Sequence, residues 1–297
     1  MDIKRSNGFK NFSKKIGQNN HFLITILIGL DAVKEGIAKK EDGFKTSWNP
    51  KSVEDSALRS REFAIKATLA WLVDCLDSYF MYTYTKPKLI QENNFESAYC
   101  SANQSVYKRY TVFKEWIYDL PDIESALVDL TISWRNRLIH SNANNPISEK
   151  SREILIANMD TISDNYQGLI IVETLEAFSN KNAPKFKEIT AMIRACRTFV
   201  QELDRNLITR LDKKRFTNEL ISYYVNEVIN QKVNTLWGKD EETRKRQLRN
   251  FLKNFSFVDS KEENELDEYI EEIANKGEQE IKEMFIHKED LSEANFL

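Results

Sequence analysis

The chain has 297 residues, of which only eight are glycine and five are proline. Together these residues make up about 4 % of the chain, whereas an ordinary globular protein has roughly 12 %. This scarcity excludes β-sandwiches, barrels and Rossmann sheets, because their tight turns need residues that tolerate positive φ. A hydrophobic fraction of 41 % excludes a wholly disordered chain. The composition predicts an all-α protein of long helices with few connections.

The net charge of −3 conceals three blocks of different charge. Residues 1–180 carry 22 basic and 23 acidic side chains, residues 181–255 carry 17 and 9, and residues 256–297 carry 4 and 14. Because salt screens charges beyond a Debye length of about 10 Å, the local blocks matter more than the total. The C-terminal part therefore consists of a basic segment followed by an acidic one.

The N-terminal part predicts a basic lead-in at residues 1–18 and then a helix over 21–40. Within this helix, residues 22–30 form the apolar run FLITILIGL. The run is too short to span a bilayer, and Asp31 and Lys34 follow it where a signal peptide would need a small-residue cleavage site. We therefore expect a buried first helix, no membrane partner and a cytoplasmic protein.

Apolar residues at spacings of three and four predict further helices along the chain. Their expected bounds are 53–82, 103–120, 123–140 and 148–178, and then 185–204, 213–237, 241–255 and 262–286. Residues 169–172 (LIIV) have strand propensity, but no partner strand is evident and we expect a helix there. The turn-forming stretch 180–184 (NKNAP) predicts a boundary between a helical bundle at 1–180 and a helical extension at 181–297.

The three cysteines, Cys75, Cys100 and Cys196, form neither a CxxC motif nor a Cys/His cluster. This pattern excludes a disulfide framework and a structural zinc site. We expect all three to be buried apolar residues in a reducing cytosol. We predict no bound metal and no other cofactor.

The stretch 134–140 (WRNRLIH) ends the helix predicted at 123–140. It precedes residues 141–146 (SNANNP), whose polar turn formers and proline are expected to terminate that helix. Asn136 and His140 are four residues apart and share a helix face, and Arg137 lies three residues before the histidine. Arg135 lies about 140° around the helix from His140, but its long side chain can reach the same edge. The helix end is therefore expected to present an imidazole, an amide and two guanidinium groups together.

This set of groups suits RNA cleavage without a metal ion. The 2′-hydroxyl must lose a proton and the 5′-oxygen must gain one, and an imidazole with its ordinary pKa of about 6.5 suits both steps. Arginine carries a permanent charge that binds phosphate oxygens while negative charge develops on them. The alternative is structural, because a histidine at a helix end also complements the helix dipole, and chance alone places some arginines near histidines.

In these residues the sequence resembles the HEPN superfamily. The family motif is an arginine followed within a few residues by a histidine near the end of a late helix, often with a polar residue directly after the arginine. Arg135, Asn136 and His140 match this motif. The resemblance extends over residues 20–180 and implies a helical bundle that dimerises and brings two such motifs into one cleft.

The resemblance also implies a metal-independent endoribonuclease that leaves a 2′,3′-cyclic phosphate and acts as a toxin or an anti-phage defence effector. It makes His140 the acid/base residue, Arg135 the phosphate-binding residue and Asn136 a polar support, while the helical wheel adds Arg137 as an RNA-binding residue. Expected partners are RNA such as tRNA or mRNA, a second copy of the chain, and an antitoxin or sensor protein. The alternative is a non-catalytic helical module that binds RNA or protein in a defence or toxin–antitoxin complex.

HEPN proteins often have an acidic residue near the site on an earlier helix. Glu62, Asp74 and Asp77 all lie on a suitable predicted helix, and the sequence does not distinguish among them. Each of the three is equally consistent with a solvated helix edge.

The basic stretch 239–253 offers Arg244, Arg246 and Arg249 as further RNA-binding residues, because guanidinium groups neutralise a phosphate backbone. The alternative is a solvated helix face. We also hypothesise that the acidic segment 256–297 folds back over this face and covers it. In that case the acidic segment would regulate access to RNA.

Overall fold

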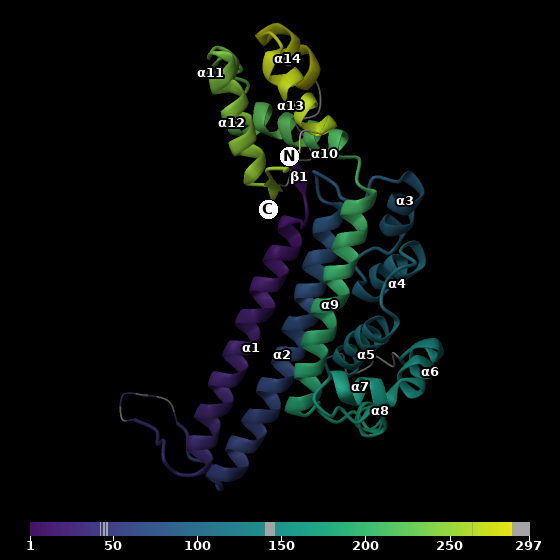
Figure 1. The fold of residues 1–297 in the computed structure, drawn as a ribbon. Coiled ribbons are helices and arrows are strands. Elements are labelled where there is room, and N and C mark those ends of the chain that lie inside the picture. The colour runs from purple at the N-terminus through teal and green to yellow at the C-terminus, as the bar shows by residue number, and fades with distance from the viewer. Residues whose placement is uncertain (42, 44, 46, 140–145, 263, 287–297) are drawn as a thin grey trace. The chain divides into compact units, whose positions relative to one another are not determined.

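The computed structural model describes residues 1–41, 43, 45, 47–139, 146–262 and 264–286 (Figure 1). Within these residues it contains 14 α-helices, one π-helical segment and two strands of two residues each. The prediction of an all-α protein is therefore confirmed. None of the described helices is both long enough and apolar enough to cross a membrane.

The chain folds into two compact units, each assembled from separated segments. Unit 1 contains residues 1–10, 81–101 and the described part of 204–297, and unit 2 contains the described part of 11–80 and 102–203. The stretch 180–184, expected to be a domain boundary, lies inside unit 2. One physical reason is that the indole Nε1 of Trp134, in the core of that unit, donates a hydrogen bond of 2.9 Å to the carbonyl oxygen of Asn182.

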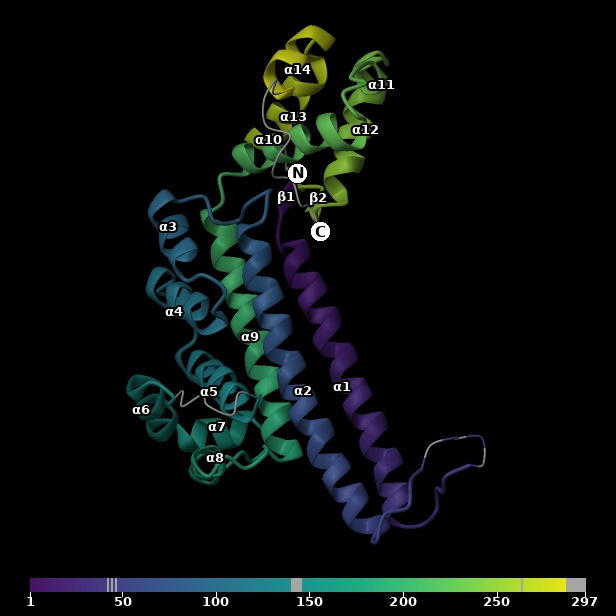
Figure 2. The same ribbon diagram turned by 180° about the vertical axis from the view of Figure 1, so that it is seen from behind.

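Unit 2 is a bundle of long and short helices. It contains most of α1 (Asn7–Lys34) and α2 (Val53–Tyr84) and the larger part of α9 (Phe186–Arg210). Figures 1 and 2 show α2 between α1 and α9, with the shorter helices on the α9 side. These shorter helices are α4 (Val106–Trp116), α5 (Asp122–Ile139), α6 (Glu149–Ala157), α7 (Met159–Asn165) and α8 (Ile171–Ser179). The largest fully buried side chains of this unit include Phe80, Tyr110, Phe113, Trp134 and Phe199.

Local signals explain where the predicted helices of unit 2 are divided. The helix expected over 103–120 is reduced to α4, because the Oγ of Ser105 accepts the amide of Lys108 and caps its start. The helix expected over 148–178 becomes α6, α7 and α8, and Gly168, with φ +75°, lies between the last two. The second half of the stretch 169–172 is the start of α8, so the preference for helix over strand is confirmed there.

Unit 1 joins the start of the chain to its C-terminal part. Strand β1 (Asp2–Ile3) pairs antiparallel with β2 (Phe257–Val258), and Ile3 lies opposite Phe257. The helices that lie wholly within this unit are α3 (Asn93–Ser101), α10 (Lys213–Tyr223), the π-helical η1 (Tyr224–Val228), α11 (Asn234–Trp237), α12 (Glu241–Lys253), α13 (Glu265–Asn275) and α14 (Glu278–Phe285). The helices expected over 213–237 and 262–286 are thus each divided into shorter ones.

The expected lead-in at residues 1–18 is wrong. Helix α1 already begins at Asn7, because the Oγ of Ser6 accepts the amide of Phe9 at 3.0 Å and caps the first turn. The amide of Ser6 in turn donates to the carboxylate of Asp204, which is almost fully buried, at 2.9 Å. A cap held by a buried carboxylate gives this helix start a defined place in unit 1.

The expected burial of residues 22–30 is also wrong. Leu23 and Leu27 are buried, but the other large side chains at the centre of this run are exposed, namely Phe22, Ile24, Ile26 and Ile28. The buried pair is one stripe of α1, four residues apart, so the fold covers only one side of a helix that is apolar on all sides.

The prediction that all three cysteines are buried holds for two of them. Cys75 and Cys196 are buried, and Cys100 is exposed at the end of α3. The thiol of Cys100 donates to the phenol oxygen of Tyr84 at 3.1 Å. Burial raises the pKa of the Cys75 thiol to about 11, and it raises that of Cys196 further.

Candidate functional site

Helix α5 carries the described part of the predicted catalytic motif. Nη1 of Arg135 donates a hydrogen bond of 3.0 Å to Oδ1 of Asn136, whose side chain is only 8 % exposed. The amide of Asn136 therefore fixes the adjacent guanidinium at the C-terminal end of the helix. His140 lies outside the described residues, so the structure shows the arginine and the asparagine of the motif but not the histidine.

Arg137 has partners in its own unit that account for its position. Its guanidinium lies over the ring of Phe178, with Cζ 4.5 Å from the ring centroid, and Nη2 donates to the carbonyl oxygen of Ser179 at 3.5 Å. Phe178 also packs edge-on against Trp134, with ring centroids 5.9 Å apart. Arg137 therefore connects the end of α5 to the end of α8, which gives it a structural role beside the RNA-binding role expected from the sequence.

Helix α5 is a rigid support for these side chains because it is buried over most of its length. Every residue from Ser125 to Trp134 is buried. The phenol of Tyr110 donates to the carbonyl oxygen of Ser125 at 2.6 Å, and the indole of Trp134 is held as described above. A helix packed on all sides positions the groups of its last turn more precisely than a loop does.

A buried carboxylate on the same helix, Asp129, was not singled out by the sequence. It accepts hydrogen bonds from the hydroxyls of Ser148 at 2.6 Å and Ser151 at 2.7 Å, and from that of Ser133 at 3.3 Å. Ser148 is also the N-cap of α6 and accepts the amide of Ser151. No local pattern in the sequence pointed to this group, because Ser148 and Ser151 lie 19 and 22 residues further along the chain.

The same carboxylate affects two tyrosines of α4. Burial, and then the nearby negative charge of Asp129, raises the pKa of Tyr107 and raises that of Tyr110 well above its usual value. Both phenols are therefore neutral over the physiological pH range. Asp129 is thus a buried charged residue of α5 in an apolar bundle. It binds hydroxyl groups at the start of α6 and lies near the phenols of α4.

The three acidic candidates on α2 have different surroundings. The carboxylate of Asp77 forms an ion pair of 2.5 Å with Nη1 of Arg109, a buried arginine of α4. Glu62 pairs with Lys66 one turn along the same helix, at 2.5 Å, and Asp74 is exposed. Asp77 is therefore the candidate that the structure connects to another helix, through an arginine 32 residues further along the chain.

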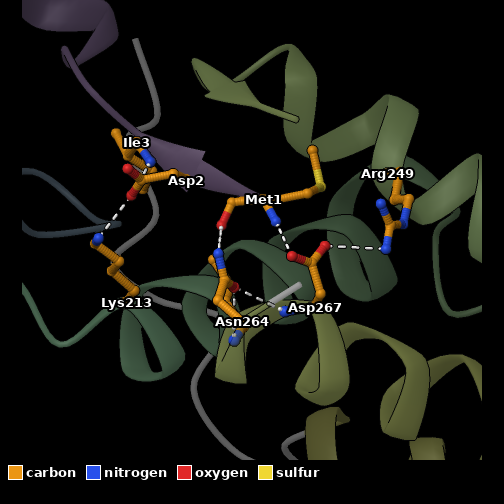
Figure 3. A network of polar contacts seen from close by, with 8 residues as sticks. Met1, Asp2, Ile3, Lys213, Arg249, Asn264 and Asp267 are labelled. Atoms are coloured by element: carbon orange, nitrogen blue, oxygen red, sulfur yellow. Dashed lines mark hydrogen bonds and ion pairs between the residues drawn. The ribbon is translucent and has the colours of Figure 1, made fainter. Parts of the chain in front are cut away.

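The basic residues of α12 are engaged by groups of their own unit. Arg244 donates to the carbonyl oxygens of Lys239, at 3.0 Å, and Ala274, at 2.9 Å. Nη2 of Arg249 pairs with the carboxylate of Asp267 at 3.0 Å, and Figure 3 shows that carboxylate between Arg249 and the amino group of Met1, to which it also binds. The side chain of Arg246 is exposed, and it is the member of the expected RNA-binding set most open to solvent.

A shallow cavity of about 360 Å³ lies along this helix. Its lining contains Lys245, Arg246, Arg249 and Lys253, together with Glu242 and with Glu271 of α13. Lys245 pairs with Glu241 at 2.8 Å, and Lys253 pairs with Asp259 at 2.8 Å. The local positive charge is therefore partly neutralised inside unit 1.

The described part of the acidic segment 256–297 packs on α12 and belongs to the core of unit 1. Leu266, Ile270 and Ile273 of α13 are buried, and the indole of Trp237 donates to the carbonyl oxygen of Ile273 at 3.1 Å. Asn264 caps α13 through the amides of Leu266 and Asp267. Removal of this segment would expose the core, so charge-neutralising substitutions are the suitable way to examine its effect on α12.

Within the described ranges, no group of three or more histidine, cysteine, aspartate or glutamate side chains is arranged to hold a metal ion. Comparisons of the sequence with protein-family models, with curated proteins and with solved structures gave no match.

Proposed function

We propose that this chain is a metal-independent endoribonuclease of the HEPN type that acts as a toxin or as an effector of anti-phage defence. The observation that carries the proposal is the contact between Arg135 and Asn136 at the end of the buried helix α5. It fixes a permanent positive charge close in sequence to His140, in the order that the motif requires. The proposal rests on these residues and on the resemblance to the HEPN superfamily.

In the proposed reaction His140 removes the proton of the 2′-hydroxyl. The 2′-oxygen then forms a bond to phosphorus and the bond from phosphorus to the 5′-oxygen breaks, with a proton returned to that oxygen. Arg135 binds the phosphate oxygens as their negative charge increases, and Asn136 keeps the guanidinium in place. The products are a 2′,3′-cyclic phosphate and a free 5′-hydroxyl, and no metal ion takes part in the step.

We further propose the substrate, the protein partners and the cellular location of this enzyme. The substrate is RNA, with tRNA and mRNA as the first candidates, and the active form is a homodimer that brings two motifs together. An antitoxin or sensor protein restrains the enzyme until it is needed. All of these components act in the cytoplasm.

A second candidate is a non-catalytic helical module that binds RNA or protein. The contacts of Arg137 favour it, because its guanidinium already has partners within the chain. In this case Arg135 and His140 support the end of α5 and perform no chemistry.

Incubation of total RNA with purified protein in excess EDTA separates the two candidates. The wild-type chain should produce fragments with 2′,3′-cyclic phosphate ends, and His140→Ala and Arg135→Ala should each reduce the cleavage rate by at least about 100-fold. Arg197→Ala is a matched control, because Arg197 is an exposed arginine on α9. Equal cleavage by wild type and His140→Ala, or intact RNA with wild type on RNA from both uninfected and phage-infected cells, would contradict the proposal.

A further inference from the structure

The paired helices α1 and α2 expose an apolar surface that the described part of the chain does not cover. Phe22 and Ile26 of α1 are 62 % and 47 % exposed, and Phe63 and Trp71 of α2 are 74 % and 51 % exposed. Ala67, one turn from each of the α2 residues, is exposed as well. On each helix these residues are four apart, so they form a stripe along it.

The register between the two helices places both stripes at the same level. Asn19 donates to the carbonyl oxygen of Thr68 at 3.2 Å, and Arg61 pairs with Asp31 at 2.7 Å, so α1 and α2 run antiparallel. Figures 1 and 2 both show these helices side by side. Residues 22–26 of α1 therefore lie beside residues 63–68 of α2.

Helix geometry also places the two stripes on the same side of the pair. Leu23 and Leu27 of α1 are buried, and so are Ala64, Thr68 and Leu72 of α2. Each residue of the two stripes directly precedes one of these buried residues, which is a rotation of about 100° around its helix, whereas Ile24 and Ile28 follow Leu23 and Leu27 and lie on the other side of α1. Two antiparallel helices are related by an approximate twofold axis perpendicular to the plane that contains both. Equal rotations away from the contact between the helices therefore place the exposed residues of both on the same side of that plane. The side chains of Phe22, Ile26, Phe63, Ala67 and Trp71, which we call the hairpin face, are thus one surface.

We propose that the hairpin face binds the hairpin face of a second copy of this chain, so that two α1–α2 pairs form an intermolecular four-helix bundle. The five side chains expose on the order of 500 Å² of apolar surface, comparable to the apolar share of the roughly 800 Å² that each partner contributes to a standard interface. This is near the upper end of the largest apolar patch on a typical monomer. The proposed function also requires two copies of the chain, but this inference rests on the exposed surface alone, and its test by mass is separate from the cleavage assay.

Charge favours a second copy as the occupant. No charged residue lies between His21 and Asp31 on α1, and Lys66 is the only one between Glu62 and Asp74 on α2. Lys66 is already paired with Glu62. A symmetric dimer places the same surface on both partners, and a surface without unpaired charges avoids the repulsion that this would otherwise cause.

Gly29 leaves space on α1 for another helix. It follows Ile26 by three residues in the middle of the helix, where glycine is unfavourable compared with alanine. Among the described residues, a Cβ built at this position would meet nothing within 4 Å beyond its own stretch of helix. The backbone of a neighbouring helix in a partner could use this space.

The experiment measures the mass of the full chain in solution by light scattering and sedimentation. The wild-type chain should be a dimer at micromolar concentration, and Ile26→Lys and Phe63→Lys should each raise the dissociation constant of the dimer by at least about tenfold, since each substitution occurs twice per interface. Val172→Lys is the matched control, because Val172 of α8 is 59 % exposed and lies outside the hairpin face. Circular dichroism verifies that all variants fold.

Cross-linking tests the arrangement directly. In a Cys100→Ser background, Ala67→Cys should give a covalent dimer with a short bis-maleimide, and Val172→Cys should not. A monomeric wild type at tens of micromolar, or a dimer that persists in both lysine variants, would overturn the proposal. So would a monomer that binds vesicles of phosphatidylcholine and phosphatidylglycerol and loses this binding in the lysine variants, because the face would then bind lipid.

Discussion

The backbone of Gly8 packs directly against the ring of Tyr82, and a Cβ built at residue 8 would overlap Cδ1 of that tyrosine. Gly8 is in the first turns of α1 and Tyr82 is near the end of α2, and both belong to unit 1. No side chain fits between them without displacement of the ring. The contact therefore fixes how closely the two helices approach in this unit.

Gly8→Ala should lower the free energy of unfolding by about 1–3 kcal/mol, because the added methyl group overpacks the contact with Tyr82. Gly17→Ala in the same helix is the control, since its added Cβ would meet nothing within 4 Å among the described residues outside its own stretch of helix. That substitution should raise stability by about 0.5–1 kcal/mol through helix propensity. Urea unfolding followed by circular dichroism measures both changes, and the same sign for both would contradict the role of the contact.

Alkaline pH should destabilise the protein through tyrosines that are half-buried or buried. Burial, and then the negative charge of Asp204, raises the pKa of Tyr82 from 10.0 to about 12. The unfolded chain releases this proton near pH 10, so the contribution is complete below pH 10 and is lost as the pH rises to about 12. The expected slope is about 1.4 kcal/mol per pH unit for this group.

Comparison of urea unfolding at pH 9 and pH 11 tests this expectation. Tyr82→Phe should reduce the loss of stability between the two values by about 1 kcal/mol relative to wild type. Tyr110 and Tyr166 account for the loss of stability that remains in the variant, because burial raises their pKa values as well. If the free energy of unfolding falls by the same amount between pH 9 and pH 11 in Tyr82→Phe as in wild type, Tyr82 does not contribute to the alkaline destabilisation.

Asp129→Ala should lower the free energy of unfolding by about 3 kcal/mol. It removes the acceptor of the hydroxyls of the half-buried Ser148 and the buried Ser151 and leaves them without that partner. Asp164→Ala is the control, because Asp164 is an exposed aspartate of α7 and its loss should change stability by less than about 0.5 kcal/mol. Similar effects of the two substitutions, measured by thermal or urea unfolding, would contradict the importance of the buried network.

The contacts of α12 predict different effects for two of its arginines. Arg246 is exposed, so Arg246→Ala should weaken RNA binding and reduce the salt dependence of log K by about 0.7 for a single-stranded RNA. Arg249 pairs with the buried carboxylate of Asp267, so Arg249→Ala should mainly reduce the stability of unit 1. Filter binding at several salt concentrations, together with urea unfolding, distinguishes these outcomes, and equal binding by wild type and Arg246→Ala would remove α12 from the RNA-binding surface.

The sequence located parts of the candidate site and missed others. Arg135 and Asn136 were found because their spacing from His140 is a local pattern, and the structure brings the first two into contact. Asp129 was missed because an aspartate within an apolar helix has no local signal for its partners, which lie 19 and 22 residues further along. The pairing of Asp77 with Arg109, 32 residues away, was missed for the same reason.

The amino-acid sequence by itself determined that the protein is all-α and where several of its helices begin. Scarce glycine and proline, and caps such as Ser148, act within a few residues and are visible without the fold. Only the tertiary structure decided that residues 2–3 pair with residues 257–258 and that Asp267 of the acidic segment pairs with Arg249 of α12. It also decided that most of the apolar run 22–30 is exposed, because burial depends on which distant helix lies beside a given face and not on the residues of that face alone.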